Sequence, residues 1–129
     1  MRRWLFIDTR SRETALFGWL DSQGVLKSHK VAHGAPGLMS SLARSIKLAD
    51  LKSSQGICVV QGPGSFSSIR MGTLVANLLS RTSGRPLFAV DASEAGDYVA
   101  LAESLIRREP SAYVAPVYDR EPNITCPNV

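Results

Sequence analysis

The chain has 129 residues, of which 44% are hydrophobic, so it is long and apolar enough for one globular domain with an ordinary core. Its 15 Lys and Arg residues exceed its 11 Asp and Glu residues and give a net charge of +4, but they are scattered, which disfavours a dedicated RNA-binding stripe. The two distant cysteines form neither a disulfide framework nor a metal motif, and the apolar run at residues 4–7 is too short for a signal peptide or a membrane span. We therefore expect a cytoplasmic protein.

Three strands are predicted at the start of the chain. Residues 4–9 form a short buried run, and residues 14–20 are rich in aromatic and aliphatic side chains. Turn residues at 21–24 lead into a third strand near residues 25–31. Strands joined by such short connections indicate an antiparallel meander, and the Gly and Pro residues within 33–37 end it.

Helices and strands alternate after the meander. Apolar side chains spaced from residue 38 to residue 49 predict an amphipathic first helix that ends before residues 50–54. Residues 55–61 form a buried central strand, a second helix covers residues 69–79, and a further strand covers residues 86–90. This order describes half of an actin-like or sugar-kinase-like α/β fold, with a mixed sheet of about five strands and helices packed on it.

The chain closes with a predicted helix and an extended tail. Asp91 or Ser93 can cap this helix, and Pro110 stops it. Its apolar face consists of Tyr98, Leu101, Ala102, Leu105 and Ile106. We expect the apolar residues 112–118 to lie against the body. Because no repeat or linker marks an internal boundary, residues 1–91 are assigned to an actin-like domain and residues 92–129 to a helix and tail that pack on it.

The turn between the central strand and the second helix is the most informative segment. It consists of Gly62, Pro63, Gly64, Ser65 and Phe66, followed by Ser67 and Ser68. The glycines allow backbone angles that side chains forbid, and the serines offer hydroxyls to the first helical N–H groups. Such a helix start can bind an anion, or it can be a plain capped turn. The Walker, dinucleotide-binding and nucleophile-elbow patterns are all absent from it.

The second helix carries a ridge of small residues. Small side chains recur every fourth position, at Ser68, Gly72, Ala76 and Ser80. The adjacent face carries Leu74, Val75, Leu78 and Leu79, which we expect to pack on the sheet. The small-residue ridge then lets another helix approach closely. That helix belongs either to a partner protein or to this chain, where the first helix is the candidate.

Several motifs together resemble the TsaB (YeaZ) family. They are the strand ending in Leu5-Phe6-Ile7-Asp8-Thr9, a histidine, His33, before the first helix, and the run Gly62-Pro63-Gly64-Ser65-Phe66-Ser67-Ser68-Ile69-Arg70-Met71-Gly72. The run is similar to the family signature Gly-Pro-Gly-Ser-Phe-Thr-Gly-Leu/Val-Arg-Ile-Gly and departs from it most at Ser68. The resemblance covers residues 4–91, and residues 114–122 look like the tail that closes the family's second domain.

This resemblance implies a shortened TsaB that lacks most of the second domain. Members of the family are non-catalytic paralogues of TsaD, which transfers a threonylcarbamoyl group to an adenosine beside the tRNA anticodon, and the ATPase TsaE joins the pair. The resemblance therefore implies a cytoplasmic scaffold without a cofactor, a metal or membrane contact, which meets tRNA only indirectly. The resemblance implies that it binds a TsaD-like transferase through its first two helices. When the chain is alone we expect it to homodimerise, because burying an exposed apolar helix pair against a second copy is favourable.

The implied site residues fall into two groups. The partner interface comprises Ser68, Gly72, Val75, Ala76, Leu79, Ser80, Leu38 and Leu42. The family-motif turn comprises Gly62, Pro63, Gly64, Ser65, Phe66 and Arg70.

Two departures from the family pattern bear on the alternatives. Arg10 stands where members usually have Ser, which weakens any phosphate loop at Asp8 and Thr9. His29 and His33 have the His-x-x-x-His spacing of the catalytic paralogues, but around a strand end that spacing does not bring two side chains together. The alternative function is a small actin-like ATP-binding protein or phosphotransferase that uses Asp8 and the Gly-Pro-Gly-Ser turn, although one domain supplies only half of a nucleotide cleft.

Overall fold

A five-stranded mixed sheet forms the centre of the molecule. The computed structural model describes residues 2–117, except for the side chains of Ser28, His29, Ala32, Gly34, Ala35, Pro36 and Met39. The strands are β1 (Arg3–Asp8), β2 (Thr14–Asp21), β3 (Leu26–His33), β4 (Gly56–Gly62) and β5 (Leu87–Asp91), and their order in the sheet is β3-β2-β1-β4-β5. Strands β1 to β3 pair antiparallel, whereas β4 pairs parallel with both β1 and β5. The predicted meander and mixed sheet are thus confirmed.

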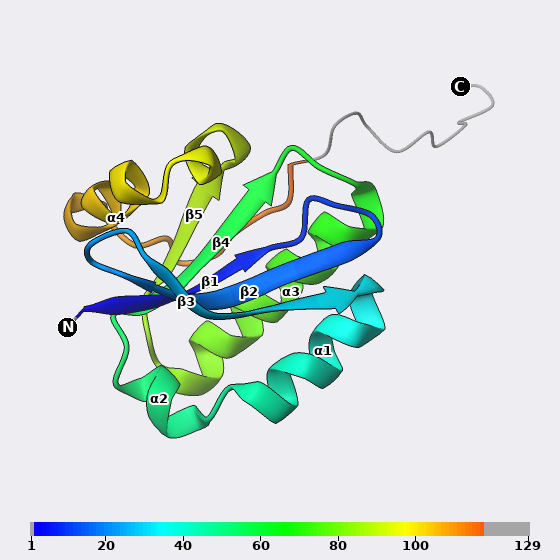
Figure 1. The fold of residues 1–129 in the computed structure, drawn as a ribbon, viewed down its shortest axis with the longest axis horizontal. Coiled ribbons are helices and arrows are strands. Elements are labelled where there is room, and N and C mark those ends of the chain that lie inside the picture. The colour runs from blue at the N-terminus through cyan, green and yellow to red at the C-terminus, as the bar shows by residue number, and fades with distance from the viewer. Residues whose placement is uncertain (1, 118–129) are drawn as a thin grey trace.

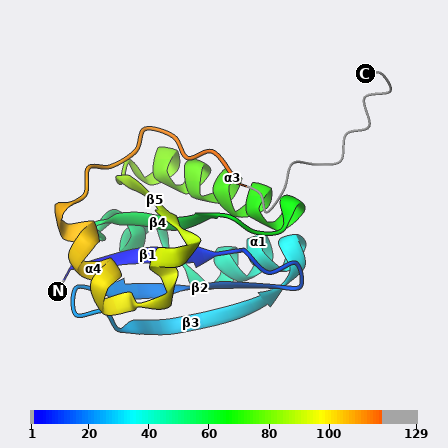
Figure 2. The ribbon, with the colours of Figure 1, turned by 90° about the horizontal axis from the view of Figure 1, so that it is seen from above.

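The two faces of the sheet are covered by different helices. On one face lie α1 (Gly34–Ser45), α2 (Leu48–Lys52) and α3 (Phe66–Ser83). On the other lie a short 3-10 helix, η1 (Ala92–Gly96), and α4 (Tyr98–Arg107). Side chains alternate along the strands, so Leu5 and Ile7 of β1 join the core beneath α1 to α3, and Trp4 and Phe6 join the core beneath α4. Figures 1 and 2 show the resulting three layers.

The first helix differs from its prediction at both ends. It begins at Gly34, within the segment that was predicted to be a break. A proline is tolerated at the third helical position, because an N–H there would have no partner within the helix. The helix ends at Ser45, since the next residue, Ile46, is extended (φ −107°, ψ 120°) and packs against the core. A separate helix, α2, then occupies Leu48–Lys52, which was predicted to lie largely beyond the helix.

The other helices confirm their predicted positions, with one error in capping. Helix α3 contains the predicted residues 69–79 and ends at Gly84, whose φ of +71° favours glycine. Asp91 caps η1 in a capping box with Glu94, and Asp97 caps α4 by accepting hydrogen bonds from the Val99 and Ala100 N–H groups. The prediction that Asp91 or Ser93 caps the last helix was wrong, because a separate 3-10 turn comes first.

The described part of the tail lies against the body, as predicted. The Ser111 N–H donates to the Leu87 carbonyl of edge strand β5 (2.6 Å), and the Val117 N–H donates to the Gln61 carbonyl (2.7 Å). Between them Val114 is 1% exposed and belongs to the core beneath α3. Figure 2 shows this segment running beside α3. The predictions for residues 118–129 lie outside the described residues.

No membrane-spanning candidate exists among the helices described. None of them combines the length and the apolar character that a bilayer crossing requires.

Candidate functional site

The glycine-rich turn joins β4 to α3 and is packed on both sides by backbone. A Cβ atom at Gly62, where φ is +124°, would lie 1.9 Å from the Val117 carbonyl oxygen. A Cβ atom at Gly64 would lie 2.8 Å from the Arg10 Cα. The two glycines therefore let the tail and the β1–β2 connection approach the turn. These contacts give both glycines a structural role in the chain itself.

The predicted serine capping is absent at the start of α3. Ser65 is the N-cap residue, but its side chain makes no capping hydrogen bond. Its backbone is held instead, since its N–H donates to the Arg10 carbonyl (3.1 Å) and its carbonyl accepts from the Ile69 N–H (2.9 Å). Phe66 and Arg70 of the family motif are exposed on the first turns of α3, whereas Ser68 is buried. The capping prediction was thus wrong for Ser65.

Asp8 is engaged by a cation from its own chain. The Arg10 guanidinium donates to both carboxylate oxygens of Asp8, with Nε–Oδ1 at 3.0 Å and Nη2–Oδ2 at 2.8 Å. The hydrogen bond to Asp8 raises the pKa of Arg10 in spite of partial burial. Partial burial of Tyr98 raises the pKa of its hydroxyl, and the negative charge of Asp8 raises it further. A metal ion at Asp8 would therefore have to displace Arg10.

The small-residue ridge of α3 faces the chain's own sheet. A Cβ atom at Gly72 would lie 2.0 Å from the Thr9 Oγ1 at the end of β1, and Ala76 is fully buried in the core. Ser68 lines a cavity with Thr9 and with Leu38 of α1. The neighbour of the ridge is therefore this chain, mainly through the end of β1. The predicted partner contacts at Ser68, Gly72 and Ala76 are not accessible in the described structure.

The prediction for the apolar face of α3 was half right. Val75 is buried in the core beneath α3, and Leu79 packs against that core. Leu74 and Leu78, expected on the sheet, are 52% and 50% exposed. The reason is geometric: Leu74 and Leu78 come two residues after Gly72 and Ala76, which is about 200° round the helix, so they point away from the sheet that the small residues approach. The sequence contained this signal, because close approach to a flat sheet requires small side chains as much as approach to another helix does.

An apolar groove lies between α1, α2 and α3. It encloses about 230 Å³ and is lined by Leu42, Ala43, Ile46, Leu48, Leu51, Val75 and Leu79. Of the predicted interface residues, Leu38, Leu42 and Val75 are buried, which leaves Leu79 and Ser80 partly exposed. The exposed apolar side chains of α3 thus include Leu74, Leu78 and, in part, Leu79.

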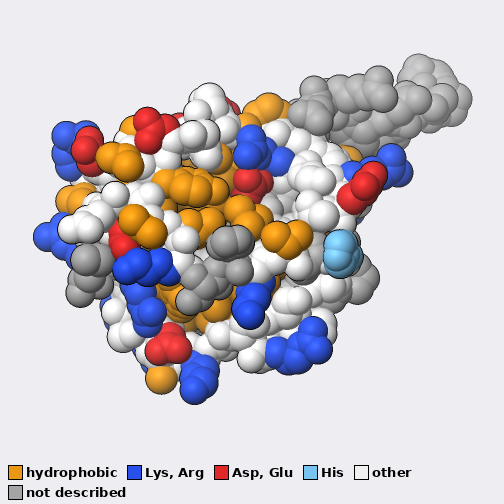
Figure 3. All heavy atoms as spheres, in the orientation of Figure 1, with side chains coloured by type: hydrophobic (Ala, Val, Ile, Leu, Met, Phe, Trp, Pro, Cys, Tyr) orange, Lys and Arg blue, Asp and Glu red, His pale blue; other side chains and the backbone are white. Residues whose placement is uncertain are grey.

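On the face shown in Figure 3, Lys and Arg are interspersed with Asp and Glu around a central group of apolar side chains. Among the described residues, no group of three or more His, Cys, Asp and Glu side chains could hold a metal ion. His33 is exposed, and the side chain of His29 lies outside the described set, so the spacing of these two histidines stays untested.

A family model for TsaD, described as tRNA N6-adenosine threonylcarbamoyltransferase, matches residues 27–119, which is more than half of the chain. The chain belongs to the TsaD family. Its fold is similar to part of YeaZ from Pseudomonas aeruginosa, with a TM-score of 0.51 and 22% identity over 69% of this chain. A second structure, of an uncharacterized protein with similarity to peptidase YeaZ from P. aeruginosa, gives a TM-score of 0.52 and 22% identity over 70% of this chain.

The match to these structures is partial on their side. Each is covered over 44% of its own length, so the chain spans less than half of the solved structures it matches. No curated protein sequence matched the chain. The predicted resemblance to the TsaB (YeaZ) family and the actin-like fold are confirmed, and membership of the TsaD family relates the chain to the biosynthesis of threonylcarbamoyladenosine in tRNA.

Proposed function

We propose that this chain is a non-catalytic scaffold subunit in the modification of tRNA to threonylcarbamoyladenosine. It binds a TsaD-like transferase through the face formed by α1, α2 and α3. The observation that carries the proposal is an apolar groove of about 230 Å³ between α1, α2 and α3, on a helix α3 that also leaves Leu74 and Leu78 half exposed. The two leucines lie four residues apart on α3, and each directly precedes a residue that lines the groove, Val75 or Leu79.

The energetics favour covering this face with a partner helix. Complete burial of a leucine side chain contributes about 1.5–3 kcal/mol, so covering the exposed halves of Leu74 and Leu78 contributes a similar total for the pair. The groove has room for an apolar side chain from the partner, which is the usual way in which one helix packs on two others. An interface of about 800 Å² per partner, typical of specific complexes, needs the exposed surface of α1 and α2 as well.

Two further features support a scaffold over the alternative phosphotransferase. Asp8, the carboxylate that such an enzyme would use, is paired with Arg10 of the same chain. The turn from Gly62 to Ser65 is packed against the β1–β2 connection and the tail, and its glycines serve those contacts. In the proposed complex a TsaE-like ATPase joins the pair, and tRNA contacts the transferase.

The test is complex formation with TsaD from the same organism, measured by size-exclusion chromatography with light scattering. Leu78→Arg places a charge in the proposed interface, and Ile106→Arg is the matched control, because Ile106 is similarly exposed (44%) on α4 across the sheet. Ala76 is unsuitable for such a substitution, since it is fully buried.

We expect the native chain and the Ile106 variant to bind TsaD, and the Leu78 variant to bind at least about tenfold more weakly, which corresponds to about 1.4 kcal/mol. Equal binding by both variants would move the interface away from α3. Failure of the native chain to bind, together with ATP hydrolysis by the chain alone, would favour the phosphotransferase. Sedimentation of the free chain at tens of micromolar tests homodimerisation through the same face.

A further inference from the structure

The hydroxyl of Thr9 is buried without a hydrogen-bond partner. Thr9 follows β1 and is 2% exposed, and its Oγ1 makes no hydrogen bond within the described structure. A buried hydroxyl left in this state is costly, and nearly all such groups in folded proteins have a protein or water partner. The Thr9 Oγ1 lacks a partner because the Thr9 side chain lies against the Cα of Gly72, and a carbon atom offers no hydrogen-bond acceptor.

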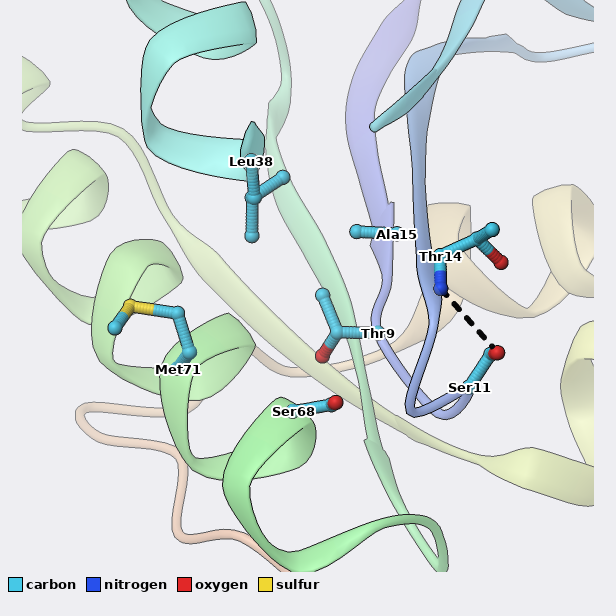
Figure 4. Close-up of a pocket in the computed structure, with 7 residues that line it drawn as sticks. All are labelled: Thr9, Ser11, Thr14, Ala15, Leu38, Ser68 and Met71. Atoms are coloured by element: carbon cyan, nitrogen blue, oxygen red, sulfur yellow. Dashed lines mark hydrogen bonds between the residues drawn. The ribbon is translucent and has the colours of Figure 1, made fainter. Parts of the chain in front are cut away.

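A small cavity adjoins this hydroxyl. It lies between the β1–β2 connection and the first turn of α3, and Figure 4 shows the hydroxyls of Thr9 and Ser68 entering it from these two elements. Ser11 lines the same cavity. The Ser11 Oγ accepts hydrogen bonds from the N–H groups of Glu13 (3.2 Å) and Thr14 (3.4 Å), and in Figure 4 it points toward Thr14 and away from the hydroxyls of Thr9 and Ser68.

The size of the cavity selects the ligand. Its volume is about 10 Å³, which matches the space that the centre of one water molecule needs and excludes a phosphate or a nucleotide. Leu38, Met71 and Ala15 form the apolar part of the wall, and the hydroxyl of Thr14, which also lines it, points away from Thr9 and Ser68 in Figure 4. A guest molecule therefore finds its side-chain partners in the hydroxyls of Thr9 and Ser68.

We propose that this cavity is a binding site for a single ordered water molecule that bridges the hydroxyls of Thr9 and Ser68. Each hydroxyl can donate or accept, so one water satisfies Thr9 and ties the end of β1 to the start of α3. Two protein partners are within the usual range for a buried water. The site also assigns Thr9 a role inside the fold, because its hydroxyl serves the internal water and is withheld from ligands in solution.

The test is a high-resolution crystal structure of the native chain together with Thr9→Ser and Thr9→Val. Valine keeps the shape of threonine without the hydroxyl, and serine keeps the hydroxyl. We expect a solvent peak about 2.6–3.2 Å from Thr9 Oγ1 and Ser68 Oγ in the native chain, retained in the serine variant and lost in the valine variant. In solution, water-to-amide cross-relaxation at Ser68 should follow the same pattern.

Three results would overturn the proposal. One is a native structure in which the Thr9 hydroxyl donates directly to a protein carbonyl with no solvent peak in the cavity. The second is a solvent peak that persists unchanged in the Thr9→Val variant. The third needs no variant crystal: it is a native chain in which water-to-amide cross-relaxation at the Ser68 N–H is no stronger than at the N–H of an exposed helical residue such as Thr82.

Discussion

Asn77 fastens the tail to α3 with its side-chain amide. Its Oδ1 accepts from the Val114 N–H (3.0 Å), and its Nδ2 donates to the Val114 carbonyl (2.9 Å) and to the Thr73 carbonyl (2.8 Å). The amide thus pairs both backbone groups of one tail residue, as a neighbouring strand would. Because the Val114 side chain is buried, loss of this pairing should loosen a part of the core and not only a surface contact.

The expected cost of Asn77→Ala follows from these bonds. A net hydrogen bond contributes about 0.5–1.5 kcal/mol, so losing the two bonds to Val114 should lower the free energy of unfolding by about 1–3 kcal/mol. The Thr73 carbonyl lies within the helix, so its lost bond adds little. Alanine is a better helix former than asparagine and offsets part of the cost, by roughly 0.5 kcal/mol. Thr82→Ala, at an exposed position of α3, measures that gain separately.

The assay is urea denaturation together with hydrogen exchange at the Val114 amide. We expect the Asn77 variant to unfold at lower urea with a similar slope, and its Val114 amide to exchange at least about tenfold faster. An Asn77→Ala variant within about 0.5 kcal/mol of the native chain, after correction by the Thr82 control, with unchanged exchange at Val114, would refute the reasoning.

Three further outcomes follow from single side chains. Gly72→Ala should destabilise the chain by about 1–3 kcal/mol in urea, because its Cβ would meet Thr9 Oγ1 at 2.0 Å, and Thr9→Ala should recover part of that loss; strict additivity of the two changes would contradict the contact. The pKa of Asp21 is lowered by a hydrogen bond from the Val25 N–H, then by one from the Gln23 N–H and by Lys27, which together outweigh its desolvation. The stability that Asp21 gives the fold is therefore complete above the pKa of an unfolded aspartate and disappears as the pH falls below about 4. Urea midpoints at pH 6 and pH 3 should therefore differ less for Asp21→Asn than for the native chain. Burial raises the pKa of the Cys58 thiol, so in a Cys126→Ser background a thiol reagent should label Cys58 only as fast as the chain unfolds, and rapid labelling of the native state would show that the site opens locally.

Local sequence determined the five strands, the position of α3 and their order, whereas the separate short helices α2 and η1 were not predicted from it. The run Ile57 to Val60 reads as a buried central strand because apolar side chains on both faces require a covered parallel strand, and it is one. The periodicity of residues 69–79 and the glycine after α3 likewise depend on interactions within a few residues. The glycine-rich motif indicated the family, because a run of eleven residues in a fixed order identifies a family even when the contacts of those residues are unknown.

Only the tertiary structure decided which side of α3 faces inward. The ridge at Gly72 and Ala76 allows close approach to any flat neighbour, and the sequence does not say whether that neighbour is a partner helix or the end of β1. The same holds for Gly62 and Gly64, whose contacts with Val117 and Arg10 join segments far apart in the chain. Periodicity reports that a helix has two faces, but the assignment of each face depends on packing between distant residues, which is why the exposed leucines emerged only from the folded chain.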